Sequence, residues 1–305
     1  MTLGLGVVVM SLTGIFAPPR QVPGIHATNA FYYYEDVEAA WAWYDEVMGF
    51  ETVVDYGFAK ILRVAPASYL TLVDAAAGMH SADEPKSVTL AIVTEQVAGW
   101  WDYLTGLGVP MRADFDEIEG RAHDGFVAID PEGYFLEFER FNPHPENPLL
   151  MPRLAEGGSL GPVTGSRPAE LEVQATVLWL YYDALAPVQT FYERLLGTDL
   201  LVDQGWAKVY AASATGYIGL VDGSRGLHQA TEEAGVTVSF FTDAVEVWFE
   251  RARALGLEIR EPGLSVESDR VDVFVGYDPG GYYLEWDTFR DVADNRRLLD
   301  LLGSR

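Results

Sequence analysis

The amino-acid sequence repeats itself at a constant distance. The stretch DYGFAKILRVAPASYLTLVD begins at Asp55 and recurs without a gap from Asp203 as DQGWAKVYAASATGYIGLVD, 148 residues later. The same shift carries DPEGYFLE at 130–137 onto DPGGYYLE at 278–285, and GMHSADE at 78–84 onto GLHQATE at 226–232. Because the shift stays constant over this length, we infer that a whole domain was duplicated.

The duplication predicts how the chain is divided. We expect a first domain at 25–144 and a second at 171–290, joined by a linker at 145–170 that is rich in Pro, Gly and Ser. A C-terminal helix is expected at 291–305. Residues 1–24 contain an apolar stretch of signal-peptide length followed by Ala17 and two prolines, so an exported or periplasmic protein is slightly favoured over a cytoplasmic one, although no Lys or Arg precedes the stretch.

Each copy has a regular inner order of strands and helices. The helical segments are recognised by apolar residues at helical spacing that end in glycine, and the strands by short apolar or aromatic runs between turn residues. In the first copy the predicted elements are strand 29–35, helix 36–49, strands 51–55, 58–64 and 69–73, strand 87–94, helix 95–108, and strands 125–130 and 134–141. This order predicts two β-α-β-β-β modules in each copy.

One such module cannot bury both faces of its sheet. We therefore expect the two modules of one copy to pair into an open, curled sheet with helices outside and a concave inner face for a small ligand. Two fused copies also favour a monomer that contains an internal pseudo-dimer.

The amino-acid composition limits the classes of molecule that the chain can bind. The chain has 46 acidic and 20 basic residues, a net charge of −26, which repels nucleic acid and anionic membranes. No apolar run reaches the roughly 20 residues that span a bilayer. The chain has no cysteine, so disulfides, thiolate metal sites and cysteine nucleophiles are excluded. The expected partner is a small molecule.

Three motifs relate the chain to a known family. A strand leads into EDVEAAWAWYDEVMGF in the first copy, the second copy has APVQTFYERLLGTDL, and both copies end in D-P-x-G-Y-x-L-E. In these motifs the chain resembles the vicinal oxygen chelate superfamily of glyoxalase I, extradiol dioxygenases and the bleomycin- and fosfomycin-resistance proteins. The resemblance covers roughly 29–141 and 177–289 and implies an α+β fold of tandem domains. It implies no single reaction, because this fold hosts isomerases, dioxygenases, epimerases, transferases and plain binders.

The resemblance also implies where metal ligands would lie, on the first and last strands of the modules. In the first copy these positions hold Asn29, Thr89 and Glu137, and the second copy retains one good ligand, Glu285. A catalytic divalent metal takes about three imidazole or carboxylate ligands. We therefore expect no metal and no other cofactor; if a divalent metal were bound, Asn29, Thr89 and Glu137 would be its ligands.

Three side chains are candidates for catalysis. Glu137 and Glu139 lie on one face of the last strand, and a buried carboxylate with an acidic neighbour has a raised pKa suited to a general base. Lys60 is expected to face the concavity, where it would hold an anionic group or neutralise Glu137; a structural Lys–Glu pair within each barrel is the alternative. His123 has Val271 as its counterpart in the repeat and is expected at the cavity mouth as a proton-transfer residue.

Aromatic residues are expected to line the cavities and contact a ligand. The ligand-binding candidates of the first cavity are Asn29, Phe31, Tyr33, Phe58, Thr89, Phe135 and Glu139. The corresponding lining of the second cavity is Trp179, Tyr181 and Tyr283. The repeated His80 and His228 are interpreted as serving the fold, because the second copy has lost nearly everything else that a metal site needs.

Two functions are carried forward. The first is a lyase or isomerase that transfers a proton on a small oxygenated molecule in the first-copy cavity, with Glu137 as base and Lys60 or His123 stabilising charge. The alternative is a non-catalytic protein that binds or sequesters a small molecule, as the resistance proteins of this family do. The carboxylate pair favours the former, and the aromatic lining favours the latter.

Overall fold

The computed structural model describes residues 22–112, 114–115 and 117–303. The predicted export segment at 1–24 therefore lies, up to residue 21, outside the described residues. Over the described ranges, no helix combines the length and the apolar character needed to cross a membrane.

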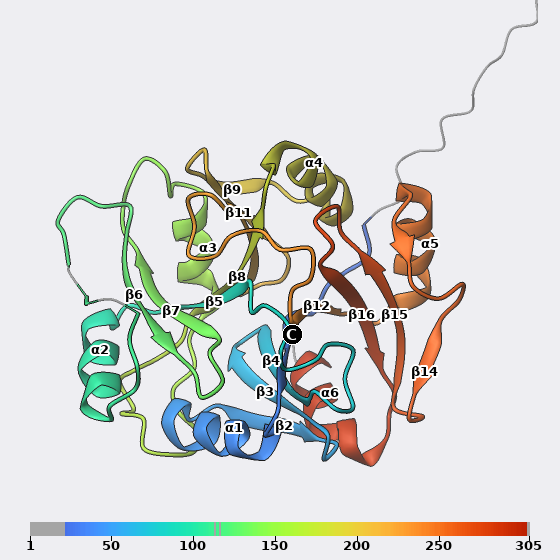
Figure 1. Cartoon of the computed structure of the whole chain (residues 1–305), viewed down its shortest axis with the longest axis horizontal. Helices are drawn as coiled ribbons and strands as arrows, with labels where there is room; N and C mark the ends of the chain where they lie inside the picture. The colour runs from blue at the N-terminus through green and yellow to red at the C-terminus, as the bar shows by residue number, and fades with distance from the viewer. Residues whose placement is uncertain (1–21, 113, 116, 304–305) are drawn as a thin grey trace, which may run out of the picture.

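Four modules follow one another along the chain, as the repeat predicts (Figure 1). Module 1 contains β1 (Ala27–Tyr34), α1 (Val37–Trp43) with its π-helical continuation η1 (Tyr44–Met48), β2 (Glu51–Asp55), β3 (Ala59–Ala65) and β4 (Ser68–Asp74). Module 2 contains β5 (Val88–Val93), α2 (Val97–Gly106), β6 (His123–Ile129) and β7 (Phe135–Phe141). Module 3 contains β8 (Ala175–Tyr182), α4 (Leu185–Leu196), β9 (Leu200–Asp203), β10 (Ala207–Ala211) and β11 (Gly216–Asp222). Module 4 contains β12 (Val236–Phe241), α5 (Val245–Leu255), β13 (Glu258–Ile259), β14 (Ser265–Glu267), β15 (Val271–Tyr277) and β16 (Tyr283–Phe289).

Within the described residues these strands form two sheets, and each sheet takes one module from each copy. The first sheet joins modules 1 and 4 in the order β13-β15-β16-β12-β1-β4-β3-β2, with β14 on β15. The second joins modules 2 and 3 in the order β6-β7-β5-β8-β11-β10-β9. The α+β class and the paired modules are confirmed. The expectation that both modules of one copy share a sheet is wrong, because β1 pairs with β12 and β5 pairs with β8.

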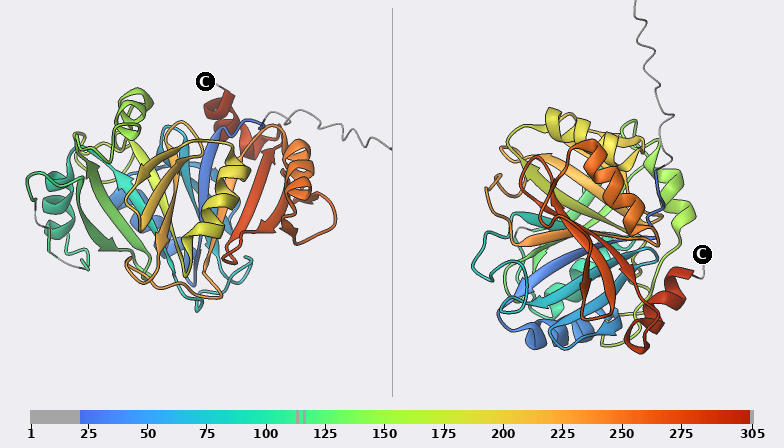
Figure 2. Two further views of the ribbon diagram at one scale, coloured as in Figure 1. Left: turned by 90° about the horizontal axis from the view of Figure 1, so that it is seen from above. Right: turned by 90° about the vertical axis from the view of Figure 1, so that its right-hand side faces the viewer.

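The alternation of side chains along the strands separates the two faces of each sheet. On β1, Tyr32 and Tyr34 point to the helix side, where Tyr32 stacks on Tyr134 with ring centroids 3.8 Å apart, while Phe31 and Tyr33 point to the concave side. The two sheets lie side by side, and α2 and α5 lie at opposite ends of the molecule (Figures 1 and 2). The concave faces are therefore free to form cavities.

The D-P-x-G-Y motif connects the sheets. Asp130, which follows β6, accepts hydrogen bonds from the hydroxyl groups of Tyr34 (2.6 Å) and Tyr44 (3.1 Å) of module 1. Its other carboxylate oxygen accepts from the backbone N–H of Tyr134 at 2.8 Å. In the second copy Asp278 accepts equivalent bonds of 2.6 and 3.0 Å from two tyrosine hydroxyl groups. Each copy is thus held together by this loop, although its modules belong to different sheets.

A histidine from the segment that links two modules of one copy packs against aromatic side chains of each sheet. Both histidines lie between two aromatic rings, one from each copy. The ring-centroid distances are His80–Tyr33 4.9 Å, His80–Tyr283 4.3 Å, His228–Tyr181 5.1 Å and His228–Phe135 4.5 Å. These contacts agree with the interpretation that the two histidines serve the fold.

Two short helices cover equivalent positions of the two sheets. The predicted linker at 145–170 contains α3 (Leu150–Gly157), whose Leu150 and Leu154 pack against the concave side of the second sheet. The predicted C-terminal helix at 291–305 is present as η2 (Ala293–Asn295) and α6 (Arg296–Gly303), whose Leu298 packs in the same way on the first sheet.

We predict that Asp130→Ala lowers the free energy of unfolding by about 3 kcal/mol, because two buried tyrosine hydroxyl groups and a backbone N–H lose their acceptor. Urea titration followed by circular dichroism measures this difference. Asp83→Ala, at an exposed position, is the control and should change the value by less than about 0.5 kcal/mol. Equal effects of the two substitutions would contradict the role assigned to the motif.

Candidate functional site

Each sheet curls around a cavity that receives two carboxyl groups from its last strand. Cavity A, between modules 1 and 4, has a volume of about 160 Å³ and receives Glu285 and Asp287 from β16. Cavity B, between modules 2 and 3, has a volume of about 190 Å³ and receives Glu137 and Glu139 from β7. Both cavities are therefore candidates for a ligand site.

The residues predicted to share one cavity are divided between the two. Phe31, Tyr33 and Phe58 line cavity A, whereas His123, Glu137 and Glu139 line cavity B. The prediction of one common cavity is wrong because β1 pairs with β12, so its concave residues face the carboxyl groups of the second copy. The same exchange brings Trp179 and Tyr181, expected in the second-copy cavity, next to Glu137 in cavity B.

Lys60 does not face a cavity. Its ammonium group lies 3.0 Å from Asp55 and 3.0 Å from Glu38, and 4.9 Å from the ring centroid of Trp41 on α1. The concave side of β3 is formed by Ala59 and Ile61. The expected orientation was wrong because β3 begins at Ala59, so Phe58 lies in the preceding turn and does not share a strand face with Lys60. The alternative, a Lys–Glu pair within the barrel, is not found either: Lys60 pairs with Asp55 and Glu38 on the helix side of the sheet.

Three other candidates lie beside the cavities. Asn29 is buried on β1, where its side-chain oxygen accepts a 2.9 Å hydrogen bond from Thr71. Thr89 is buried on β5, with its hydroxyl 2.8 Å from the hydroxyl of Tyr181. Phe135 packs on His228. None of the three belongs to the described lining of cavity A or cavity B.

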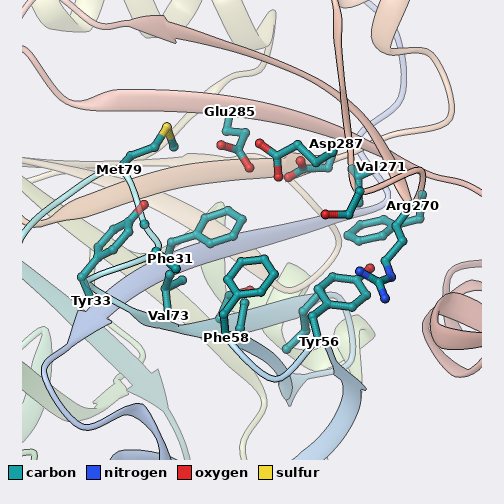
Figure 3. A pocket seen from close by; sticks show the side chains of 18 residues that line it. Phe31, Tyr33, Tyr56, Phe58, Val73, Met79, Arg270, Val271, Glu285 and Asp287 are labelled. Atoms are coloured by element: carbon teal, nitrogen blue, oxygen red, sulfur yellow. The ribbon is translucent and has the colours of Figure 1, made fainter.

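Cavity A is lined by aromatic rings and by the two carboxyl groups of Glu285 and Asp287. Figure 3 shows Glu285 and Asp287 side by side above the rings of Phe31 and Phe58. Ser239 on β12 donates a 2.6 Å hydrogen bond to Asp287. Among the described lining residues Arg270 alone is cationic; it pairs with Asp294 at 2.8 Å and stacks on the ring of Tyr56 at 4.9 Å. The acid pair therefore has no cationic partner within the cavity.

Burial raises the pKa values of the Glu285 and Asp287 carboxyl groups. It raises the pKa of Asp287 to about 7, and burial together with the charge of Asp287 raises the pKa of Glu285 well above its ordinary value. The two neighbouring carboxyl groups therefore hold a proton at neutral pH.

Cavity B contains a similar carboxyl pair in two different environments. Glu139 is 2% exposed, while Glu137 is partly exposed to the cavity. Burial raises the pKa of Glu137 to about 7, opposed in part by the nearby indole N–H of Trp179. Burial and the charge of Glu137 raise the pKa of Glu139 well above its ordinary value. Burial lowers the pKa of His123, so its imidazole is neutral at pH 7.

An outer cavity of about 700 Å³ adjoins cavity B. Both are lined by His123 and Glu137, so these two side chains stand where the inner and outer cavities meet. The outer cavity is also lined by Arg112 and Arg121, which are exposed. A ligand can therefore reach Glu137 from solvent through the outer cavity.

Three polar atoms around cavity B have no hydrogen-bond partner within the described part of the chain. They are Oε1 of Glu139, Nε1 of Trp179 and Nδ1 of His123. An unpaired buried polar group costs about 1–3 kcal/mol, so three of them at one cavity indicate a site for a polar ligand.

Gln204, Trp206 and Arg225 are among the lining residues of cavity B that sequence reasoning missed. The repeat offers a signal for one of them: Trp206 occupies the place of Phe58 in the G-[FW]-A-K motif. Trp206 lies in the same cavity as Glu137, however, only because modules 2 and 3 share a sheet, and the motif does not predict that pairing.

The residues around the carboxyl pairs do not fit a divalent metal. In the strand register, Glu285 lies opposite Ser239 and then Asn29, and Glu137 lies opposite Ala91 and then Val177. Across the described ranges, no three His, Cys, Asp or Glu side chains are placed to hold a metal ion. We therefore derive no step through a metal.

Comparison with known proteins gives a family match over the first copy and a similar fold over nearly the whole chain. Residues 24–138 match the model of the Glyoxalase/Bleomycin resistance protein/Dioxygenase superfamily. A candidate dioxygenase from Bacillus subtilis subsp. subtilis strain 168 has a similar structure, with a TM-score of 0.61, 16% sequence identity, and coverage of 93% of this chain and 91% of that one. Glyoxalase I from Zea mays gives a TM-score of 0.60 at 17% identity, over 92% of this chain and 95% of that one. No curated protein sequence matched the chain.

The raised pKa of Glu137 predicts a pH-dependent stability difference. The unfolded chain ionises this carboxyl near 4.5 and the folded chain near 7, so its contribution to stability is lost as the pH rises between these values. Relative to wild type, Glu137→Gln should therefore gain roughly 3 kcal/mol of unfolding free energy between pH 4.5 and pH 8.

Urea titrations of both proteins at a series of pH values test this expectation. The other titratable side chains lining cavity B are Glu139, His123, Tyr181 and Arg225, and all remain present in the variant. Glu119→Gln, at an exposed position, serves as the control. A difference between Glu137→Gln and wild type that stays constant with pH would show that Glu137 is not desolvated.

Proposed function

We propose that the chain acts on a small oxygenated organic molecule in cavity B. Residues 24–138 match the model of the Glyoxalase/Bleomycin resistance protein/Dioxygenase superfamily, and the whole chain has a fold similar to that of glyoxalase I. The reaction is a proton transfer of the lyase or isomerase type. The observation that carries the proposal is the position of Glu137, a carboxylate exposed to the cavity beside a deeply buried second carboxyl group.

Glu137 is the base. With a pKa of about 7 it is substantially ionised at neutral pH and is still basic enough to accept a proton from a carbon acid. The proton moves from the carbon to the Glu137 carboxylate, and the negative charge moves to the substrate. Return of the proton to another atom completes an isomerisation, and loss of a neighbouring leaving group completes an elimination.

His123 relays the proton. Its neutral imidazole stands with Glu137 at the junction of the inner and outer cavities, and its Nδ1 has no partner in the described structure. An imidazole at this place can carry a proton between Glu137 and solvent. Lys60 has no part in the proposal, because it is held in an ion pair on the helix side of the first sheet.

We also propose that the chain is a monomer in which the two copies take the places of two subunits. The pairing of β1 with β12 and of β5 with β8 supports this, because one chain supplies both partners of each junction.

We predict that Glu137→Gln lowers turnover about 10²- to 10⁴-fold while ligand binding persists. A thermal-shift screen of small carbonyl and hydroxy compounds identifies binders, and proton NMR in D₂O then measures exchange of their carbon-bound hydrogens. Glu285→Gln, which alters cavity A, is the matched control and should leave exchange unchanged. Unimpaired exchange with Glu137→Gln would refute the assignment of the base.

A second function, binding without catalysis, is supported by cavity A. Its acid pair is already partnered by Ser239, and the equivalent of His123 is Val271, which cannot relay a proton. Its aromatic walls suit a flat organic molecule held by stacking.

If cavity A is a binding site, a ligand that raises the melting temperature of the wild type should lose most of this effect with Phe58→Ala, because a wall of the cavity is removed. Trp206→Ala in cavity B is the matched control and should keep the shift. The opposite pattern would place the ligand in cavity B.

A further inference from the structure

The two cavities descend from one sequence, so equivalent positions can be compared through the 148-residue shift. Several positions in or beside the cavities differ in polarity between the copies. Three of these pairs bear on the carboxyl groups and their surroundings; cavity B first, they are Ala91 and Ser239, Trp179 and Phe31, and His123 and Val271. Cavity A thus serves as an internal reference for what is special in cavity B.

In cavity B an alanine stands where cavity A has a serine, so one carboxyl oxygen of Glu139 has no hydrogen-bond partner in the described structure. In cavity A the hydroxyl of Ser239 donates a 2.6 Å hydrogen bond to Asp287, the counterpart of Glu139. Ala91 occupies the equivalent place on β5 and has no hydroxyl to donate. Within the described residues, Oε1 of Glu139 has no hydrogen-bond partner, although the residue is only 2% exposed.

The exchange of phenylalanine for tryptophan adds a donor. The indole N–H of Trp179 can only donate a hydrogen bond. It lies near the Glu137 carboxylate, whose pKa it lowers, but it makes no hydrogen bond within the described structure, and the residue is 8% exposed on the wall of cavity B. Phe31 offers no such group in cavity A.

We propose that the Glu139 carboxyl group, in its protonated form, and the Trp179 indole N–H together bind the oxygen of a neutral carbonyl substrate in cavity B. This inference rests on the proposed proton transfer by Glu137 and names its substrate class. Two donors directed at one cavity favour an acceptor atom, and they bind it most strongly when negative charge develops on it.

The charge balance supports a neutral substrate. One ionised carboxylate, Glu137, stands in the cavity of a chain with a net charge of −26, so an anion is repelled. When Glu137 takes the proton next to the carbonyl, the C–H electron pair forms the C=C bond and the carbonyl oxygen becomes an enolate. The negative charge passes from Glu137 to this oxygen, and the net charge of the site is unchanged.

The size and lining of cavity B suit a small, flat group, and any larger part of a substrate would extend into the outer cavity. A cavity of about 150 Å³ holds a benzene molecule, and cavity B has about 190 Å³. Phe141, Tyr181 and Trp206 contribute aromatic surface on which such a molecule can stack. A phenol has the shape and the oxygen charge of a cyclic enol, so it is a suitable probe.

The test follows the indole signal of Trp179 in a ¹H–¹⁵N NMR spectrum of the full chain at pH 6. The chain has 8 tryptophans, and the signal is assigned by its loss in Trp179→Phe. We expect phenol to move this signal downfield, and more acidic fluorophenols of similar shape to move it further and bind more tightly. Toluene, which lacks the oxygen, should not cause the downfield movement.

Three variants make the test specific. Ala91→Ser supplies the missing hydroxyl to Glu139 and should weaken phenol binding about tenfold, as should Trp179→Phe. Ser239→Ala, the reverse change in cavity A, should leave the Trp179 response unchanged. An unmoved Trp179 signal, equal movement with toluene, or unchanged affinity in Ala91→Ser and Trp179→Phe would each overturn the proposal.

The outcome can be separated from that of the proposed function. If phenols bind as expected but Glu137→Gln retains full hydrogen exchange, the donor pair stands and the base is wrongly assigned. If Glu137→Gln abolishes exchange and the Trp179 signal does not respond to phenols, the base stands and the donor pair is wrong.

Discussion

The pairing of β1 with β12 and of β5 with β8 determines which side chains share a cavity. In each junction two first strands lie antiparallel, one from each copy, and they place the concave residues of one copy opposite the last-strand carboxyl groups of the other. Because of this pairing, Glu137 lies in one cavity with Trp179 and Tyr181, and Glu285 lies in the other cavity with Phe31. The D-P-x-G-Y loops, by contrast, hold the modules of one copy together through Asp130 and Asp278. Neither copy can therefore form its cavity without the other.

Duplication allowed the two cavities to diverge while the fold stayed the same. Cavity A retains a carboxyl pair stabilised by Ser239, whereas in cavity B alanine replaces this serine and leaves Glu139 unpaired. The extra indole of Trp179 and the imidazole of His123 add further unsatisfied groups to cavity B. Unsatisfied buried groups lower stability, and they concentrate where a protein binds or transforms a ligand. The asymmetry between the copies thus supports our proposal that cavity B is the reactive one.

The sequence predicts local features well because they depend on local periodicity. The helix predicted at 36–49 is present over Val37–Met48, and the strand predicted at 51–55 is found with the same bounds. Glu137, Glu139 and His123 were correctly placed together because all three belong to one module. Which module it pairs with was not predictable. Alternation of apolar residues shows which face of a strand is buried, but it does not show which other strand lies beside it. Lys60 was misplaced because small apolar residues fit either face of β3: Ala59 and Ile61 were expected under the helix, whereas they line cavity A and leave Lys60 on the helix side.

The proposed chemistry depends on the Glu137–Glu139 pair in cavity B, which keeps a proton at neutral pH. Its most direct test is a pH titration of the side-chain carboxyl carbons in ¹³C-glutamate-labelled protein, with signals assigned through Glu137→Gln and Glu139→Gln. We expect one step of the pair near pH 7, assigned to Glu137, and a second well above the usual range, so that Glu139 is still protonated at pH 7. Titration of both groups near their ordinary value of 4.5 would contradict the account.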